Sequence, residues 1–252
     1  MDYRQIIESY HRLRPEDRPL SCGAVVLGAG SAHRMGFDKM TPMLDGQPVL
    51  VRAVNAFEQS PLVSEIVVVT RADRIEEIAS LCAQYNLSKV SAVVCGGKTR
   101  TESALAGVMA LKTDVQLTAV HDGARPLLSG ALIEACIRRA SRQFAVIPVL
   151  RSTDTLRSVD EKGALNGTYD RDRVVRVQTP QVFLTALLKA ALTDACEKGL
   201  SLTDDAAAIE RLGMTVQSVP GEEENIKLTT PADLTLARGI LEQRGGKEPG
   251  QP

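Results

Sequence analysis

The chain has 252 residues, of which 44% are hydrophobic and only 3% aromatic, so its core must consist mainly of Ala, Val, Leu and Ile. This length and composition fit one large domain or two small ones, and they favour a parallel sheet flanked by helices over a β-sandwich. The formal net charge of −1 excludes a global electrostatic attraction to nucleic acid or to an anionic membrane, so we expect neither as a partner.

The cysteines and the apolar runs indicate in which cellular compartment the protein works. The five cysteines are an odd number and form no C-x-x-C pair, which favours buried, reduced thiols and argues against a zinc site. No apolar run approaches the roughly 20 residues that cross a bilayer, and the polar N-terminus lacks the core of a signal peptide. We therefore expect a cytoplasmic protein.

In chain order, short apolar strands alternate with helical patterns. We expect residues 1–20 to be an N-terminal extension, 21–243 a single domain and 244–252 a disordered tail. The strands are predicted at 23–28, 65–70, 91–96, 117–123 and 144–150, with helices at 48–59, 75–82, 103–111 and 130–140. This alternation predicts a Rossmann-like α/β fold, with a mostly parallel sheet and functional loops at the carboxyl ends of the strands.

The pattern changes after Leu150. Residues 151–178 are charged and contain only short β-type pieces, which predicts a protruding β-arm. Helical patterns resume at 185–199 and 203–213, where Asp204 and Asp205 favour the helix N-terminus. A strand at 214–220 and a helix that starts at Thr230 complete the chain.

The glycine loop after the first strand, AVVLGAGSAHRMG (24–36), matches neither standard nucleotide motif. A dinucleotide fingerprint needs a third glycine where His33 stands, and its helix would have to start at once. Pro42, Gly46 and Pro48 instead predict an irregular chain until Val49. The P-loop signature G-K-[ST] is also absent from this stretch.

A long anion-binding loop remains as the functional interpretation. The backbone amides of Gly28, Ala29 and Gly30 would approach phosphate oxygens, and Arg34 and Lys39 would add positive charge. The alternative is a surface loop whose two cations are simply solvated.

Five segments together resemble a known family. Residues 28–50, GAGSAHRMGFDKMTPMLDGQPVL, resemble the opening signature of sugar- and alditol-phosphate nucleotidyltransferases, and alone would equally suit the molybdenum-cofactor nucleotidyltransferases. The downstream segments GGKTRTESALAG (96–107), HDGARP (121–126), RVQTPQVF (176–183) and ENIKLTTPADL (224–234) resemble the 2-C-methyl-D-erythritol 4-phosphate cytidylyltransferases. The resemblance runs from about Gly23 to Leu241 and implies a nucleotide-diphospho-sugar transferase-like fold.

The activity that the resemblance implies is transfer of a cytidylyl group from CTP to an alditol phosphate, with Mg²⁺ as cofactor and pyrophosphate as product. Such chemistry depends on positioning and positive charge. The resemblance assigns catalytic roles to Arg34, Lys39 and Lys227. Without its motif, Lys227 would be an ordinary lysine at a strand end.

Asp122 ends a predicted strand, where a carboxylate oxygen suits Mg²⁺. The alternative for Asp122 is a cap or turn former, but the resemblance makes it a ligand of metal and substrate and makes Arg125 a residue that binds the acceptor. His121 lies on the opposite face of the strand, so we expect a structural role for it.

The remaining implied residues recognise the two substrates. Gly96 and Ser103 resemble a cytosine pocket, with the backbone of Gly123 beside the nucleotide and Arg100 ordering the loop. Ser103 is otherwise a plain helix residue. Thr155 and Arg171 of the arm would bind the acceptor phosphate, with Thr179 facing the same pocket.

The resemblance further implies a homodimer in which the arm completes the acceptor site of the second subunit. The sequence departs from the family pattern at Gly28, Ala32 and Lys98, and in a shorter loop between Met35 and Lys39. Two alternatives stay open: a ribitol-5-phosphate cytidylyltransferase and a non-catalytic nucleotide-binding protein.

Overall fold

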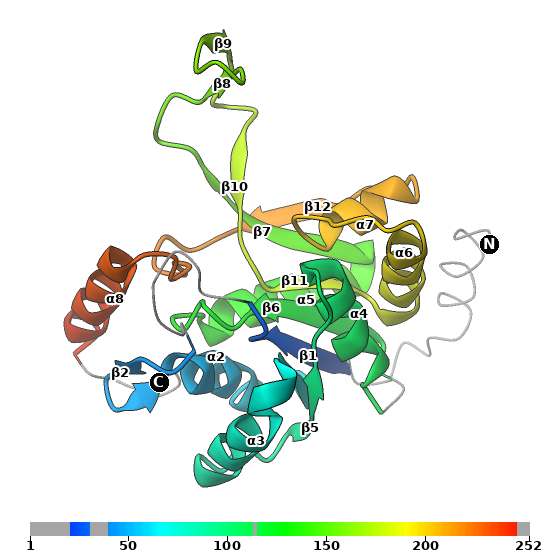
Figure 1. Cartoon of the computed structure of the whole chain (residues 1–252), viewed down its shortest axis with the longest axis vertical. Coiled ribbons are helices and arrows are strands. Elements are labelled where there is room, and N and C mark those ends of the chain that lie inside the picture. The colour runs from blue at the N-terminus through cyan, green and yellow to red at the C-terminus, as the bar shows by residue number, and fades with distance from the viewer. Residues whose placement is uncertain (1–20, 31–39, 113–114, 246–252) are drawn as a thin grey trace.

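A twisted sheet forms the centre of the molecule (Figure 1). The computed structural model describes residues 21–30, 40–112 and 115–245. The strands of the main sheet follow the order β10–β7–β11–β6–β1–β4–β5. Strands β10 and β11 pair with the two ends of one edge of β7, and β12 pairs with the opposite edge. The bounds of the main-sheet strands in that order are Val175–Val177, Ala145–Arg151, Gln181–Leu184, Leu117–Asp122, Cys22–Leu27, Val63–Thr70 and Val90–Cys95, with β12 at Gln217–Pro220.

The sheet is mostly parallel on one side and mixed on the other. β1, β4, β5 and β6 are mutually parallel, which brings their carboxyl ends to one edge. β11 runs antiparallel to both β6 and β7, and β10 runs antiparallel to β7. β11 is a strand that the sequence pattern did not predict. Its four buried residues, QVFL, are too few to show a period before the helix that follows them.

Helices cover both faces of the sheet (Figure 1). Alternate side chains of β1 enter two different cores, because successive strand residues face opposite sides. Ala24 and Val26 pack with α2, α3 and α5, whereas Val25 packs with α4, α6 and α7. The helices are α2 (Val49–Glu58), α3 (Ile75–Gln84), α4 (Arg100–Met109), α5 (Gly130–Gln143), α6 (Thr185–Glu197), α7 (Ala206–Arg211) and α8 (Pro231–Gln243), and η1 (Ala72–Arg74) is a 3₁₀ turn.

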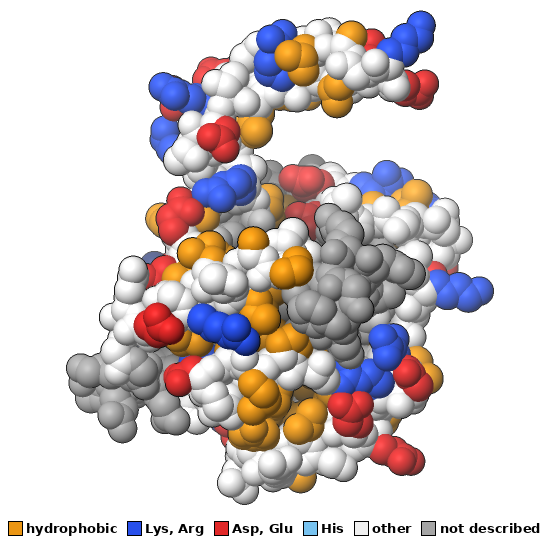
Figure 2. Space-filling model, turned by 60° about the vertical axis from the view of Figure 1, so that its left-hand side comes forward, with side chains coloured by type: hydrophobic (Ala, Val, Ile, Leu, Met, Phe, Trp, Pro, Cys, Tyr) orange, Lys and Arg blue, Asp and Glu red, His pale blue; other side chains and the backbone are white. Residues whose placement is uncertain are grey.

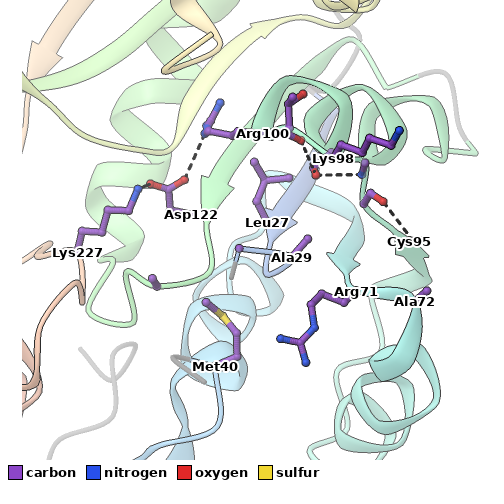
Figure 3. Close-up of a pocket in the computed structure, with 16 residues that line it drawn as sticks. Leu27, Ala29, Met40, Arg71, Ala72, Cys95, Lys98, Arg100, Asp122 and Lys227 are labelled. Carbon is purple, nitrogen blue, oxygen red and sulfur yellow. Dashed lines mark hydrogen bonds and ion pairs between the residues drawn. The ribbon is translucent and has the colours of Figure 1, made fainter. Parts of the chain in front are cut away.

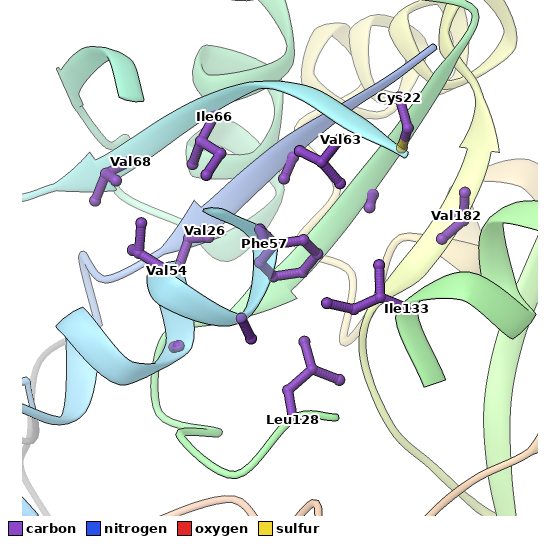
Figure 4. Close-up of a cluster of buried hydrophobic side chains, with 14 of the residues drawn as sticks. Cys22, Val26, Val54, Phe57, Val63, Ile66, Val68, Leu128, Ile133 and Val182 are labelled. Atoms are coloured by element: carbon purple, nitrogen blue, oxygen red, sulfur yellow. The ribbon is translucent and has the colours of Figure 1, made fainter. Parts of the chain in front are cut away.

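The first core is built around Phe57 of α2 (Figure 4). Phe57 and Val54 meet Val26 of β1 and Ile66 of β4, and Ile133 of α5 closes the layer. These side chains are at most 2% exposed. The aliphatic composition therefore supplies two packed layers that hold the strand ends in place.

A short hairpin corrects the expectation of an irregular chain before Val49. Strands β2 (Met43–Leu44) and β3 (Gln47–Pro48) pair antiparallel across Asp45 and Gly46. Both turn residues have positive φ, 46° and 77°, as the Asp-Gly turn of a tight hairpin requires. Leu44 packs under α8, so the hairpin joins the outer helix to the domain.

A long excursion leaves the sheet between β7 and β10 (Figure 1). It carries a separate two-stranded sheet of β8 (Arg157–Val159) and β9 (Leu165–Thr168). Most residues from 153 to 177 are exposed, including the hydrophobic side chains of Val159, Leu165 and Tyr169. We call the segment between β7 and β10 the excursion, residues 152–174.

The chain ends lie partly outside the described residues. The expected N-terminal extension, 1–20, and residues 246–252 of the expected tail are among those outside. Arg244, which caps α8, donates from its Nε to Glu224 at 2.7 Å. Within the described ranges, none of the helices combines the length and the apolar character that a membrane span needs.

Candidate active site

A cavity of about 580 Å³ opens at the carboxyl ends of the parallel strands. Four strands contribute to its wall through the residues that end them or follow them, as expected for a parallel sheet. A fifth contribution comes from the segment before α8. The lining residues that carry the argument are Gly30, Gly96, Arg100, Ser103, Asp122 and Lys227.

Three cations surround one carboxylate in this cavity. Lys227 Nζ lies 2.7 Å from Asp122 Oδ2, and the Nε atoms of Arg100 and Arg125 lie 3.7 and 3.8 Å from the same carboxylate. Figure 3 shows Lys227 and Arg100 approaching Asp122 from different sides. The Asp122 side chain is 13% exposed, whereas that of Lys227 is 42% exposed. Lys227 is therefore open to the cavity while Asp122 forms its floor.

The charge of Asp122 follows from these contacts. Burial would raise the pKa of this carboxyl, but Lys227 and Arg100, with a smaller effect of Arg125, more than reverse that and hold the pKa well below its usual range. Asp122 is therefore an anion at neutral pH, available as an oxygen ligand.

Arg100 is held in place by a buried partner. Its Nη1 and Nη2 donate to the two carboxylate oxygens of Asp205 at 2.9 and 2.7 Å, and Asp205 is fully buried. Asp204 and Asp205 were both predicted to be charges at a helix N-terminus. Only Asp204 acts there, accepting from Ala207 N–H at 3.0 Å, because the side chain of Asp205 turns to Arg100 and makes no capping bond.

His121 is a structural residue. Its ring is fully buried edge-on to Phe57, with 5.3 Å between ring centroids, and burial lowers its pKa to about 4. Nε2 lies 3.2 Å from the carbonyl oxygen of Arg125, which can only accept, so Nε2 carries the proton of the neutral ring.

The neutral ring fixes a chain of hydrogen bonds beneath Asp122. Nδ1 of His121 must accept from the Thr179 hydroxyl at 2.9 Å, and the Thr179 oxygen in turn accepts from the backbone N–H of Asp122 at 3.1 Å. Thr179 is thus buried directly behind Asp122 and lies outside the cavity wall.

The loop between β5 and α4 is shaped by Ser103. The Ser103 hydroxyl donates to the Thr99 carbonyl at 2.9 Å and accepts from Gly97 N–H at 3.1 Å. A Cβ on Gly96 would lie 2.7 Å from that hydroxyl and 2.8 Å from the Ala29 Cβ, so only glycine fits there. Ser103 therefore holds the loop while it lines the cavity.

The residues whose backbone is expected beside the nucleotide, in the loop after β1 and at Gly123 after β6, divide into two groups. Gly28 N–H donates to the Val69 carbonyl at 2.6 Å, and Gly123 N–H donates to the Leu27 carbonyl at 2.9 Å, so both amides serve the sheet. Ala29 and Gly30 lie at the cavity wall. A ligand would therefore meet the loop at Ala29 and Gly30.

Some expected site residues are not brought to this cavity. Arg34 and Lys39 lie outside the described residues. Thr155 and Arg171 are exposed on the excursion and do not line the cavity of their own chain. Arg125 is buried, and its Nη1 donates to the carbonyl of Asn225 at 2.7 Å.

Among the lining residues that the sequence did not point to, Arg71 is charged. Arg71 follows β4 and reaches the cavity wall, where it pairs with Asp73 at 3.1 Å. The rule that ligands bind at strand carboxyl ends would have found it. In the described ranges, His, Cys, Asp and Glu side chains do not gather in groups of three that could hold a metal.

Comparison with known proteins gives the family. The model of the IspD family, 2-C-methyl-D-erythritol 4-phosphate cytidylyltransferase, matches residues 22–243. The chain belongs to this family. A family member from Desulforamulus reducens, a 2-C-methyl-D-erythritol 4-phosphate cytidylyltransferase by name, is 39% identical over 224 residues, covering 88% of this chain and 96% of the relative. The protein of the same name from Dehalococcoides mccartyi is 35% identical over 222 residues, with the same coverage.

Solved IspD structures share the fold. The 4-diphosphocytidyl-2C-methyl-D-erythritol synthase of Anaerococcus prevotii superposes with a TM-score of 0.79 at 30% identity, covering 89% of this chain and 97% of that one. The cytidylyltransferase of Thermus thermophilus gives 0.72 at 31% identity, covering 86% and 98%. The expected α/β fold is confirmed.

Proposed function

We propose that this chain transfers the cytidylyl group of CTP to 2-C-methyl-D-erythritol 4-phosphate, releasing pyrophosphate, a step of the non-mevalonate isoprenoid pathway. Family membership and the names of its relatives support this activity. The observation that carries the proposal is Lys227 Nζ, 2.7 Å from an ionised, mostly buried Asp122 in a cavity at the sheet edge.

The reaction joins two anions. A phosphate oxygen of the acceptor attacks the α-phosphorus of CTP, a P–O bond forms, and the bond to the bridging oxygen of pyrophosphate breaks. Lys227 would contact the α-phosphate, and we assign Arg34 and Lys39 to the triphosphate. Cations placed before the reaction stabilise the charge that builds on the transferring group.

Asp122 fits a site for Mg²⁺. Magnesium in such enzymes is held by one or two carboxylates together with substrate phosphates, and Asp122 is an ionised carboxylate at the cavity floor. Bound there with the triphosphate, the ion would neutralise developing charge on the phosphate oxygens. Because three cations already surround Asp122, we expect the metal to arrive with the nucleotide.

The β5–α4 loop is the proposed base site. Its backbone at Gly96 and Gly97 lines the cavity and is fixed by Ser103, so it presents preorganised hydrogen-bonding groups to a cytosine. Ala29 and Gly30 lie in the same cavity, and we assign the phosphates to that loop.

We propose that the protein is a homodimer. Arg125 and Thr179 are buried next to Asp122, whereas Thr155 and Arg171 are exposed on the excursion and do not line the cavity of their own chain. An acceptor site at the cavity that also uses Thr155 and Arg171 would take these two residues from the excursion of a second copy. The exposed Val159, Leu165 and Tyr169 supply apolar surface for that contact, as Figure 2 shows along the projecting segment.

A cytoplasmic location completes the proposal. The burial of Cys22, Cys82 and Cys136 as free thiols is consistent with a reducing compartment, where CTP is available.

One assay tests the proposed function. Pyrophosphate release is measured with each of the four common nucleoside triphosphates, using methylerythritol phosphate or ribitol 5-phosphate as acceptor. We expect release with CTP and methylerythritol phosphate. Release with ribitol 5-phosphate alone would make the chain a ribitol-5-phosphate cytidylyltransferase, and no release from any pair would favour a non-catalytic nucleotide-binding protein.

A further inference from the structure

The segment that carries Lys227 has no regular secondary structure, and hydrogen bonds from buried side chains fix its backbone. Residues 221–228 form neither helix nor sheet between β12 and α8. Two buried polar side chains fix it instead: Gln178, from outside the segment, is 5% exposed, and Asn225, from within it, is fully buried.

Gln178 holds the start of this segment. Its side-chain Nε2 donates to the carbonyls of Glu222 and Asn225 at 2.8 and 3.2 Å, and its Oε1 accepts from Glu222 N–H at 3.1 Å. The amide thus bonds both backbone groups of Glu222, as a neighbouring strand would. A Cβ on Gly221 would lie 2.5 Å from that Oε1, so glycine permits the approach.

Asn225 holds the middle of the segment. Its side-chain Nδ2 donates to the backbone carbonyl of Thr179 at 2.9 Å. The backbone carbonyl of Asn225 accepts from Arg125 Nη1 at 2.7 Å. Leu228 N–H then donates to the Ala124 carbonyl at 2.9 Å. The backbone is therefore anchored on both sides of Lys227 to the loop that follows Asp122.

Three buried polar atoms in this cluster make no hydrogen bond within the described part of the chain, which lowers the stability of the fold. Asn225 Oδ1, Arg125 Nε and Glu222 Oε2 are buried and lack hydrogen-bond partners among the described residues. Because unsatisfied buried polar atoms destabilise a fold, a polar cluster of this kind indicates that the backbone position it fixes is needed for function.

We infer that Gln178 and Asn225 are positioning residues that set the location of the Lys227 ammonium group relative to Asp122. The inference rests on the proposed function, in which Lys227 acts on the α-phosphate. Gln178 directly follows β10, the strand by which the excursion returns to the sheet, so the cluster also links the excursion to the reacting centre.

The test is a mutant cycle on activity. Asn225→Ala and Gln178→Met are each made with Lys227 present and with Lys227→Met. Rates are measured with enzyme in excess over labelled CTP, so that slow reactions remain measurable, and steady-state kcat and KM are measured where turnover allows. Thr118→Val is the control, since it removes a buried 2.8 Å hydrogen bond to Thr185 at the other end of β6.

With Lys227 present, we expect each positioning variant to lose about tenfold or more in kcat, with KM for CTP changed less than about threefold. In the Lys227→Met background each should lose less than about twofold, because the group that it positions is gone. Thr118→Val should stay within about twofold in both backgrounds.

Equal losses in the two backgrounds, or no loss with Lys227 present, would overturn the inference. Thermal denaturation establishes that each variant is folded at the assay temperature, and Asn225→Ser replaces Asn225→Ala if the latter is not. An inactive wild type would instead overturn the proposed function, so the two failures are distinguishable.

Discussion

Lys227 and Asp122 form an ion pair of 2.7 Å at the cavity, and each has a second partner in the proposed reaction. Asp122 would exchange the ammonium group for Mg²⁺, and Lys227 would exchange the carboxylate for a phosphate oxygen. The 42% exposure of Lys227 leaves its side chain free to make that exchange.

Replacing Lys227 tests this role. We expect Lys227→Met to lower kcat about 10²–10³-fold, equivalent to about 3–4 kcal/mol, since it removes one preorganised donor to the reacting phosphate. Steady-state kinetics measure the loss and circular dichroism checks the fold. Lys198→Met, an exposed lysine paired with Asp194 on α6, should leave kcat unchanged; a similar loss there would contradict the role of Lys227.

His121 makes the stability of the fold depend on pH. Its folded pKa of about 4 lies below the ordinary value near 6.5, so the unfolded chain binds a proton first as the pH falls. We expect its contribution to be complete above pH 6.5 and to fall by roughly 3 kcal/mol between pH 6.5 and 4. Urea denaturation at pH 7, 6 and 5 measures this effect.

The matched variant for that measurement is His121→Gln, which cannot take up a proton in this range. The free energy of unfolding should fall more steeply toward pH 5 in the wild type than in the variant, because the other two histidines are common to both. Parallel curves would show that His121 titrates normally in the folded state.

At the scale of elements, the β5–α4 loop depends on close approach. The Gly96→Ala substitution would drive its Cβ into Ser103 Oγ and the Ala29 Cβ, displacing the loop and the wall beside it. We expect the KM for CTP to rise about tenfold or more while the fold is retained.

The control for that prediction is Gly130→Ala at the start of α5, where a Cβ meets no atom within 4 Å. CTP binding measured by calorimetry should weaken for Gly96→Ala and stay unchanged for Gly130→Ala. Unchanged binding in both would remove the loop from the base site.

The elements also show what the sequence could predict. Apolar periodicity placed the parallel strands and most helices, and Thr230 with Pro231 marked the start of α8, where a capping box is present. The hairpin at Asp45 and Gly46 was not predicted: Asp-Gly is a turn signal, but its strands of two residues each are too short to show a period.

The site was predictable where residues sit at strand ends and not where partners are distant in sequence. Asp122 and the β5–α4 loop were predicted because each lies at the carboxyl end of a predicted strand. The partners of Arg100 and Asn225 do not, because those contacts depend on how whole elements pack. Arg34 and Lys39 stay predictions, since they lie outside the described residues.

At the scale of the whole molecule, the excursion separates two expected acceptor residues from their own cavity. Its exposed apolar side chains would be unfavourable in an isolated monomer, and a second copy would cover them. In a symmetric dimer each site would then combine the cavity of one chain with the excursion of the other.

Subunit mixing tests this sharing. Lys227→Met damages the cavity and Arg171→Ala damages the excursion, so each homodimer should be nearly inactive. After exchange at equal amounts, about half of the dimers are mixed, and each has one intact site of two, which gives about a quarter of wild-type activity. No recovery, with exchange verified, would show that Arg171 serves its own chain or neither.

The distribution of the thiols offers a way to follow ligands without turnover. Burial raises the pKa of Cys22 and Cys136 to about 12 and that of Cys82 to about 11, which makes them poor nucleophiles. Cys95 is exposed, ends β5 and lines the cavity. A maleimide should therefore label Cys95 first, and bound nucleotide should shield it. Protection of one sulfur would then report occupancy even in variants that have lost all chemistry.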